Sequence, residues 1–171
     1  MPAVADASVL ILLAKIRRLH HLRDLYGRIL IGPVVKTEVV DRGRAINARG
    51  VELVEQALGD GWISVVRTTA PVRAQRLLDS SRLDPGEAEA IALAARRGLQ
   101  LLADDKEARL VAEALGLTYL GTAGVLLAAY RKRLLSLPEF EGAVRDLTTV
   151  SWLAPDIVTT ILKLAREEQS S

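Results

Sequence analysis

Two adjacent carboxylates, Asp104 and Asp105, follow the short apolar run 99–103, and a helical pattern begins directly after them. The apolar run predicts a buried parallel strand. Because ligands of open α/β sheets bind at the carboxyl ends of the strands, acids at this point are well placed for chemistry. One aspartate could instead cap the following helix, which explains one carboxylate well and two poorly. Acids at the ends of other strands would favour a chemical role.

Acidic residues do follow other predicted strands. Asp6 comes directly after the apolar segment 3–5, and Glu38 lies in an apolar helical segment that starts after the strand predicted at 28–31. Glu38 could also be an ordinary exposed helical glutamate, although the valines around it make full exposure unfavourable.

The helix before Asp104 carries a further acid, Glu87. It lies three residues after Asp84, with Pro85 between them, which is the pattern of a capping box with proline at the first helical position. This capping role is compatible with a role in chemistry. Glu89, two positions further, is expected on another face of the helix.

A common site for these acids follows from the topology of parallel sheets, in which crossovers bring the carboxyl ends of all strands to one edge. If the first and fourth strands are neighbours, Asp6 and Asp104 face each other, with Glu38 and Glu87 above them. Carboxylates at such distances repel unless a cation neutralises them. Because the chain has no cysteine and only two histidines, the predicted cation is a hard one, Mg²⁺ or Mn²⁺. Such a site suits phosphodiester hydrolysis.

Other polar residues receive structural interpretations. The pair His20-His21 lacks the i, i+4 spacing that places two imidazoles on one helix face, so a metal role is not expected for it. Ser8 is a candidate cap of the first helix. Thr122 follows the fifth predicted strand, where it could bind a metal-bound water, although a helix cap is preferred.

The composition of the chain indicates its size class, its location and its charge. A chain of 171 residues, half of them apolar and 4% aromatic, is long enough for one domain with a full core. It has no apolar run of about 18 residues, no N-terminal signal pattern and no cysteine, which predicts a cytoplasmic protein without a membrane partner. The net charge is +2, and arginine outnumbers lysine 18 to 5, which mildly favours an anionic partner.

The predicted elements alternate between strands and helices, as in an α/β fold. A helical pattern spans 15–26 and ends at Gly27, and 42–47 is predicted to be a polar connection. A helical tail begins at Pro138 and either covers the sheet or presents apolar surface to a partner. The strands are predicted at 3–5, 28–31, 62–66, 99–103 and 117–120.

Five motifs in this order resemble the PIN domain, and most closely its prokaryotic subgroup related to VapC-type toxins. The resemblance covers residues 3 to about 135. The motifs are Val4-Ala5-Asp6-Ala7-Ser8, Thr37-Glu38-Val39-Val40, LDPGEAEAIALA at 83–94, LLADDKEAR at 101–109 and LGTAGVLL at 120–127.

The resemblance implies a PIN-like three-layer α/β/α fold with a parallel five-stranded sheet between helices. We expect a single domain over 1–171, with a core of about 1–135 and a C-terminal helical extension of about 138–168. The resemblance also implies a Mg²⁺- or Mn²⁺-dependent endoribonuclease, a small antitoxin protein as partner and a homodimer. Asp6, Glu38, Glu87 and Asp104 would be metal ligands or water activators, with Asp105 either a further ligand or the cap of the next helix.

Two other classes of protein are alternatives. One is a PIN-like module that binds nucleic acid or protein with little turnover. The other is a different α/β enzyme, either a receiver domain or a phosphatase. A receiver has its acid pair near the first strand, whereas here the pair follows the fourth, and a haloacid-dehalogenase-like phosphatase requires an aspartate where Ser8 stands.

Overall fold

The computed structural model describes residues 1–170 and contains a five-stranded, all-parallel sheet in the order β3-β2-β1-β4-β5. In the central register, Val4 of β1 lies opposite Leu30 of β2 and Leu101 of β4. The first and fourth strands are therefore neighbours, as the convergence of Asp6 and Asp104 requires. The strands are β1 (Ala3–Ala5), β2 (Ile29–Ile31), β3 (Ile63–Val65), β4 (Gln100–Leu102) and β5 (Tyr119–Leu120).

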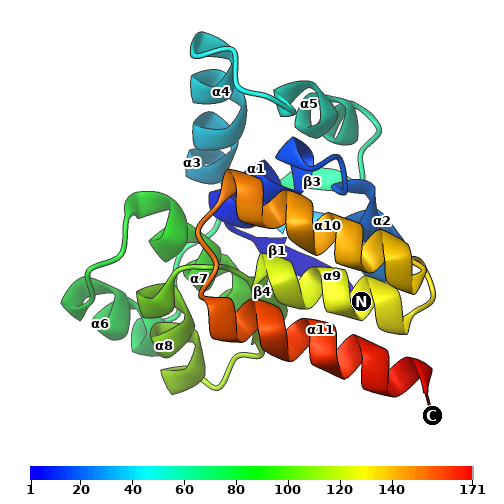
Figure 1. Ribbon diagram of the computed structural model, residues 1–171. Helices are drawn as coiled ribbons and strands as arrows, with labels where there is room; N and C mark the ends of the chain where they lie inside the picture. Colours follow the sequence, from blue (N-terminus) through cyan, green and yellow to red (C-terminus); the bar gives the residue numbers. More distant parts are fainter. Residues whose placement is uncertain (171) are drawn as a thin grey trace.

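Helices cover the sheet, and α9, α10 and α11 lie side by side in front of it in Figure 1. This arrangement confirms the PIN-like α/β/α architecture. The helical segments are α1 (Ala7–Lys15), α2 (His20–Tyr26), α3 (Pro33–Lys36), the π-helical η1 (Thr37–Asp41), α4 (Arg42–Ala45), α5 (Val51–Gly59), α6 (Val72–Ser80), α7 (Pro85–Arg97), α8 (Lys106–Ala114), α9 (Thr122–Arg131), α10 (Leu137–Val150) and α11 (Pro155–Gln169).

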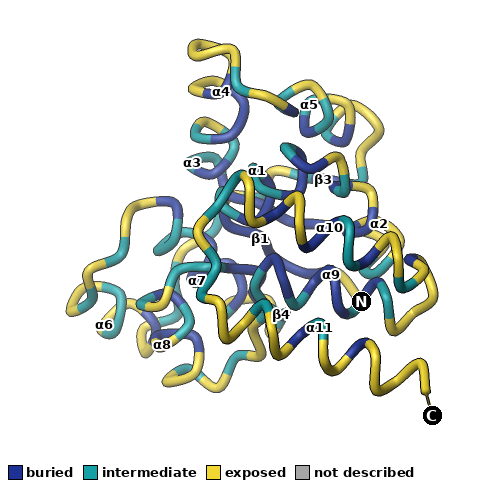
Figure 2. Tube along the Cα trace, viewed as in Figure 1, coloured by how far each residue is buried: buried dark blue, intermediate teal, exposed yellow. Residues whose placement is uncertain are grey.

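The strand residues divide between two apolar clusters because successive side chains point to opposite faces of a sheet. Val4, Leu30 and Leu101 pack in one cluster with residues of α7 and α8. Ala3, Ala5 and their neighbours of the same orientation pack in the other, with residues of α1, α9 and α10. The outer strands β3 and β5 are partly exposed, whereas the central strands β1 and β2 are covered on both faces and buried along their length (Figure 2). This double burial explains why they are continuous apolar runs in the sequence.

Two helical predictions differ from the structure. The pattern over 15–26 is interrupted, because the chain leaves the helix after Lys15, passes through Arg17 at φ 57° and resumes helical geometry at His20. The predicted connection 42–47 is helical as α4, which continues α3 and η1 without a break (Figure 1). Gly43 is buried, and a Cβ there would lie 3.0 Å from Val51. Close packing against α5 thus accounts for a helix that the polar sequence did not suggest.

The C-terminal helices pack on the cluster around α1 and α9. Phe140, Val144 and Leu147 form an apolar stripe of α10 and are buried there. On α11, Ala165 is buried and its carbonyl accepts a hydrogen bond from the Tyr130 hydroxyl at 2.9 Å. No helix in the described part of the chain has the length and apolar character needed to cross a membrane.

Candidate active site

Asp6 lies at the end of β1 and is the N-cap of α1. Its Oδ1 accepts hydrogen bonds from the backbone N–H of Val9 at 3.1 Å and from the Ser8 hydroxyl at 2.8 Å. Ser8, a candidate for the cap, does not cap this helix, because Asp6 takes that position and the Ser8 hydroxyl donates to it. The Asp6 side chain is buried, and this burial raises its pKa from 3.8 to about 7, with the charges of Asp104 and Glu87 acting in the same direction. The fold therefore buries a carboxylate beside two others.

The two adjacent aspartates after β4 have different surroundings. Both oxygens of Asp104 are held by Thr122, whose backbone N–H donates to Oδ1 at 2.7 Å and whose hydroxyl donates to Oδ2 at 2.6 Å. Asp105 is the N-cap of α8 and accepts from the Ala108 N–H at 2.9 Å. One member of the pair is thus held at the sheet edge, while the other caps the next helix.

The preferred interpretation of Thr122 as a helix cap is wrong. Gly121 is the N-cap of α9 and provides no side chain, and the Thr122 hydroxyl faces Asp104 instead. A Cβ on Gly121 would lie 2.9 Å from Oδ1 of Asp104, so the glycine leaves room for the carboxylate. The sequence signal for the contact between Thr122 and Asp104 is the pair Gly121-Thr122, which directly follows β5. This strand is the neighbour of β4, after which Asp104 lies.

Glu87 takes part in the predicted capping box of α7. Its N–H donates to Asp84 Oδ1 at 2.7 Å, and its Oε2 accepts from the Asp84 N–H at 3.0 Å. Burial raises the pKa of Glu87, and the charges of Asp84, Asp105 and Glu38 raise it further against the lowering effect of the backbone hydrogen bond. The side chain is therefore folded toward its own helix and lies within the electrostatic field of the other acids.

Glu38 projects from the π-helical turn η1. Burial is the main cause of its raised pKa, and the charge of Asp84 adds to it. A Cβ on Gly86, in the first turn of α7, would lie 2.7 Å from each carboxylate oxygen of Glu38. Glycine at this position lets the carboxylate lie against the start of α7, which brings Glu38 close to Glu87.

Glu89 has a structural role that the sequence did not reveal. Its Oε2 accepts hydrogen bonds from the backbone N–H groups of Val34 at 2.9 Å and Val35 at 3.1 Å, at the start of α3. Gly32 permits this contact, because a Cβ there would meet the Glu89 carboxyl group at 2.0 Å. Glu89 thus joins α7 to α3, the first part of the continuous helical segment α3–η1–α4 that carries Glu38.

The charges of Asp104 and Glu87 act on Asp6, and the charge of Glu38 acts on Glu87, so these four carboxylates share one electrostatic environment, here called the acidic edge. Their oxygens are not tightly clustered, since no three acidic side chains in residues 1–170 have ligand oxygens all within 4.8 Å of one another. An all-carboxylate donor set with a buried member of raised pKa fits a hard divalent cation. Mg²⁺ in particular retains several water ligands, so it does not require direct contact with every acid.

A groove of about 490 Å³ opens beside Asp104. Its lining includes Arg109, Tyr119 and Trp152, and Trp152 is 85% exposed. The Nε of Arg109 is buried and has no hydrogen-bond partner among residues 1–170. Asp104 therefore lies next to a groove whose lining includes the rings of Tyr119 and Trp152 and the side chain of Arg109.

Comparison with known proteins identifies the family. Residues 2–167 match the family model of the PIN domain. The chain belongs to the PIN-domain family. PIN domains are generally nucleases that typically bind divalent metal ions, so membership indicates a nuclease-type function and binding of nucleic acid. The match extends through the C-terminal helices, beyond the part that carries the sequence motifs. No curated protein matches the chain.

Proposed function

We propose that this PIN domain is a Mg²⁺- or Mn²⁺-dependent endoribonuclease that hydrolyses phosphodiester bonds in RNA. The observation that supports it best is the buried carboxylate of Asp6, whose pKa burial raises to about 7 while the charges of Asp104 and Glu87 act on it. Burying a carboxylate among like charges is unfavourable unless a cation compensates it. In this proposal Asp6 and Asp104 hold the cation, and Glu38, Glu87 and Asp105 lie around it.

The protein fixes the two central carboxylates before any ligand binds. Thr122 holds both oxygens of Asp104, and Ser8 with the Val9 N–H holds Oδ1 of Asp6. When bound, a divalent cation neutralises these carboxylates and stabilises the negative charge that develops on the phosphate. Glu38, whose pKa burial raises, is suited to accept a proton from the attacking water at a carboxylate oxygen.

Single-stranded RNA is the substrate that suits the groove beside Asp104. Trp152 and Tyr119 present ring surface on which unpaired bases can stack, and such stacking contributes about 1–3 kcal/mol per base. Arg109 lines the same groove, and its guanidinium charge would attract a backbone phosphate. The groove would thus hold nucleotides next to the phosphodiester that is cleaved.

The test is cleavage of a mixed-sequence single-stranded RNA in Mg²⁺ or Mn²⁺. We expect Asp6→Asn and Asp104→Asn each to lower the cleavage rate by about 100-fold or more. The matched control is Asp60→Asn, an exposed aspartate at the end of α5, which should cleave like the wild type. Metal-dependent binding without cleavage by the wild type would instead support the alternative of a PIN-like binding module, and full activity of Asp6→Asn would contradict the proposed site.

The resemblance to VapC-type toxins extends this proposal to a toxin role in the cytoplasm. A small antitoxin protein would cover the acidic edge, and the active form would be a homodimer. Expression of the wild-type chain should then arrest growth of a bacterial host, while Asp6→Asn should not. Growth arrest by both variants would show that toxicity does not depend on the acidic site.

A further inference from the structure

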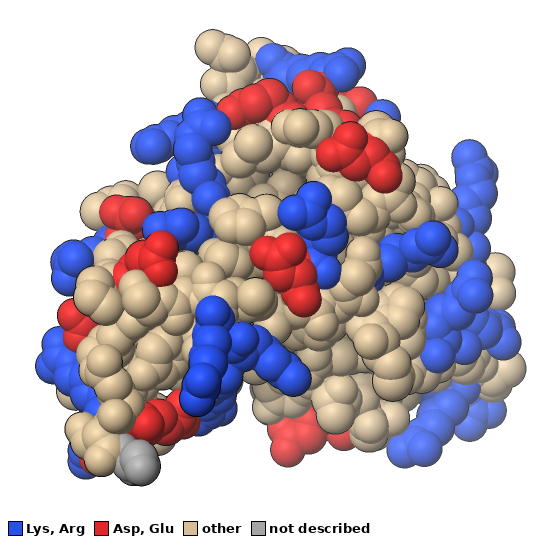
Figure 3. All heavy atoms as spheres, turned by 90° about the vertical axis from the view of Figure 1, so that its right-hand side faces the viewer, with Lys and Arg blue, Asp and Glu red and all other residues tan. Residues whose placement is uncertain are grey.

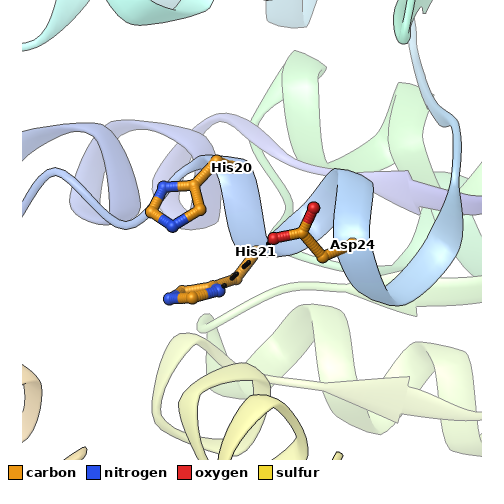
Figure 4. Close-up of side chains that lie close together, drawn as sticks. All are labelled: His20, His21 and Asp24. Carbon is orange, nitrogen blue, oxygen red and sulfur yellow. Dashed lines mark ion pairs between the residues drawn. The ribbon is translucent and has the colours of Figure 1, made fainter. Parts of the chain in front are cut away.

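A second group of metal-ligating side chains lies on α2. His20, His21 and Asp24 each offer one ligand atom, and these atoms all lie within 4.8 Å of one another (Figure 4). The two imidazole rings have their centroids 4.1 Å apart and are tilted by 44°. No other group of three histidine, aspartate or glutamate side chains in residues 1–170 meets this criterion.

The decisive member is His21, which is 3% exposed. Neither of its ring nitrogens has a hydrogen-bond partner within the described part of the chain. The contact marked by a dashed line in Figure 4 joins Nδ1 to Asp24 Oδ2 at 3.7 Å, which is too long for a hydrogen bond. Buried polar atoms without a partner are unfavourable, and coordination of an ion would satisfy one nitrogen of this ring.

The other two side chains connect the buried ring to solvent. His20 is exposed and lines a cavity of about 340 Å³ together with Arg17 and Asp60. Asp24 pairs weakly with Arg23 through Oδ1, at 3.6 Å, so its Oδ2 stays directed at His21. His20 and Asp24 are both exposed, so an ion can reach these two ligands from solvent.

We propose that His20, His21 and Asp24 bind a transition-metal ion of the Zn²⁺ class at a site separate from the acidic edge. Two imidazole nitrogens and one carboxylate oxygen are a donor set that Zn²⁺ prefers and Mg²⁺ does not. Three protein ligands leave a coordination position for water. The site would stabilise α2, which packs against α9.

The spacing of the ligands agrees with their meeting in space. Adjacent histidines diverge around a helix, but Asp24 is four residues after His20 and three after His21. Residues at these separations are neighbours on a helix surface, so the carboxylate lies within 4.8 Å of a ligand nitrogen of each ring.

Figure 3 shows one face of the molecule, on which Lys and Arg side chains are most numerous along the right-hand margin and Asp and Glu side chains lie mainly elsewhere. Near His21, the negative charges of Asp24 and Glu139 oppose the positive charge of Arg18.

The test is a calorimetric titration of the full chain with Zn²⁺, carried out in the Asp104→Asn variant to weaken the acidic site. We expect one Zn²⁺ per chain to bind, and we expect His20→Ala and Asp24→Asn to weaken its affinity at least tenfold. Asp60→Asn removes the same charge from the same neighbourhood without removing a proposed ligand, so it should leave the affinity within twofold.

A second readout avoids substitution of the buried His21, which could disturb folding. The chain has two histidines, so their imidazole NMR signals report directly on the site in the wild-type protein. Both sets of signals should shift on addition of Zn²⁺ and stay in place with the same concentration of Mg²⁺.

Three results would overturn the proposal. They are an absence of imidazole shifts at saturating Zn²⁺, a Zn²⁺ affinity unaffected by His20→Ala, and an equal loss in Asp60→Asn and Asp24→Asn. None of these measurements involves RNA cleavage, so the outcome is independent of the proposed nuclease activity.

Discussion

Replacing Asp6 by asparagine is expected to stabilise the metal-free protein at neutral and higher pH. Asparagine caps helices as well as aspartate does, and its carbonyl oxygen can still accept from Ser8 and the Val9 N–H. The change removes the buried negative charge and keeps the local geometry. Since Asp6 is 2% exposed, solvent does little to screen this charge.

The magnitude follows from the pKa of Asp6. Burial raises it from 3.8 to about 7, a difference that corresponds to about 4 kcal/mol of destabilisation when the group is fully ionised. Because the folded-state pKa lies above the unfolded-state value, the penalty is absent below pH 3.8 and complete above about pH 7. The advantage of Asp6→Asn should therefore be about 1.6 kcal/mol at pH 5 and about 4 kcal/mol at pH 8.

Urea unfolding in the presence of a chelator, at pH 5 and pH 8, measures this difference. The matched control is Asp105→Asn, another N-cap aspartate, which is less buried and should change the free energy of unfolding by no more than about 0.5 kcal/mol. Added Mn²⁺ should stabilise the wild type and not Asp6→Asn. A stability difference that does not grow between pH 5 and pH 8, or a less stable Asp6→Asn at pH 8, would refute this account of Asp6.

Three further variants test the arrangement around the site. Thr122→Val removes the hydroxyl that holds Asp104 at nearly constant volume, and calorimetry should show metal affinity at the acidic edge lowered by about 10–100-fold. Gly86→Ala places a Cβ 2.7 Å from the Glu38 carboxylate oxygens, so this carboxylate must move and RNA cleavage should fall. Because alanine favours the helix, chemical denaturation should show a free energy of unfolding that is unchanged or raised by up to about 1 kcal/mol. Glu89→Ala leaves two helix N–H groups without their acceptor and should lower the free energy of unfolding by about 1–2 kcal/mol, a loss that Glu89→Gln should largely avoid in the same denaturation assay.

The sequence predicted the fold class well because its signals are local. The short apolar runs could be identified as buried parallel strands, and all five are present in the sheet. The capping box of Asp84 and Glu87 was likewise readable, since it depends on residues three apart. The break between α1 and α2 was missed because leucines continue at helical spacing across it, although Arg17 takes a positive φ.

The acidic residues were identified from their positions after strands, but their partners were not. Thr122 lies 18 residues after Asp104, and Glu89 bonds an N–H group 55 residues away. Contacts between residues so far apart produce no regular spacing pattern in a single sequence, so they could not be predicted from it. The pair His20-His21 was judged by the i, i+4 spacing rule alone, and the proximity of Asp24 to both rings appeared only in the tertiary structure.

By itself, the sequence determined the order of the strands, the acidic residues that follow them and the likeness to PIN domains, because these depend on residue type and short-range spacing. Only the tertiary structure decided which aspartate of the pair caps a helix, that Asp6 is buried with a raised pKa, and that glycines make room for two of the carboxylates. These features arise where β1, β4, α7 and α9 meet, and burial and hydrogen bonding there depend on segments that are far apart along the chain.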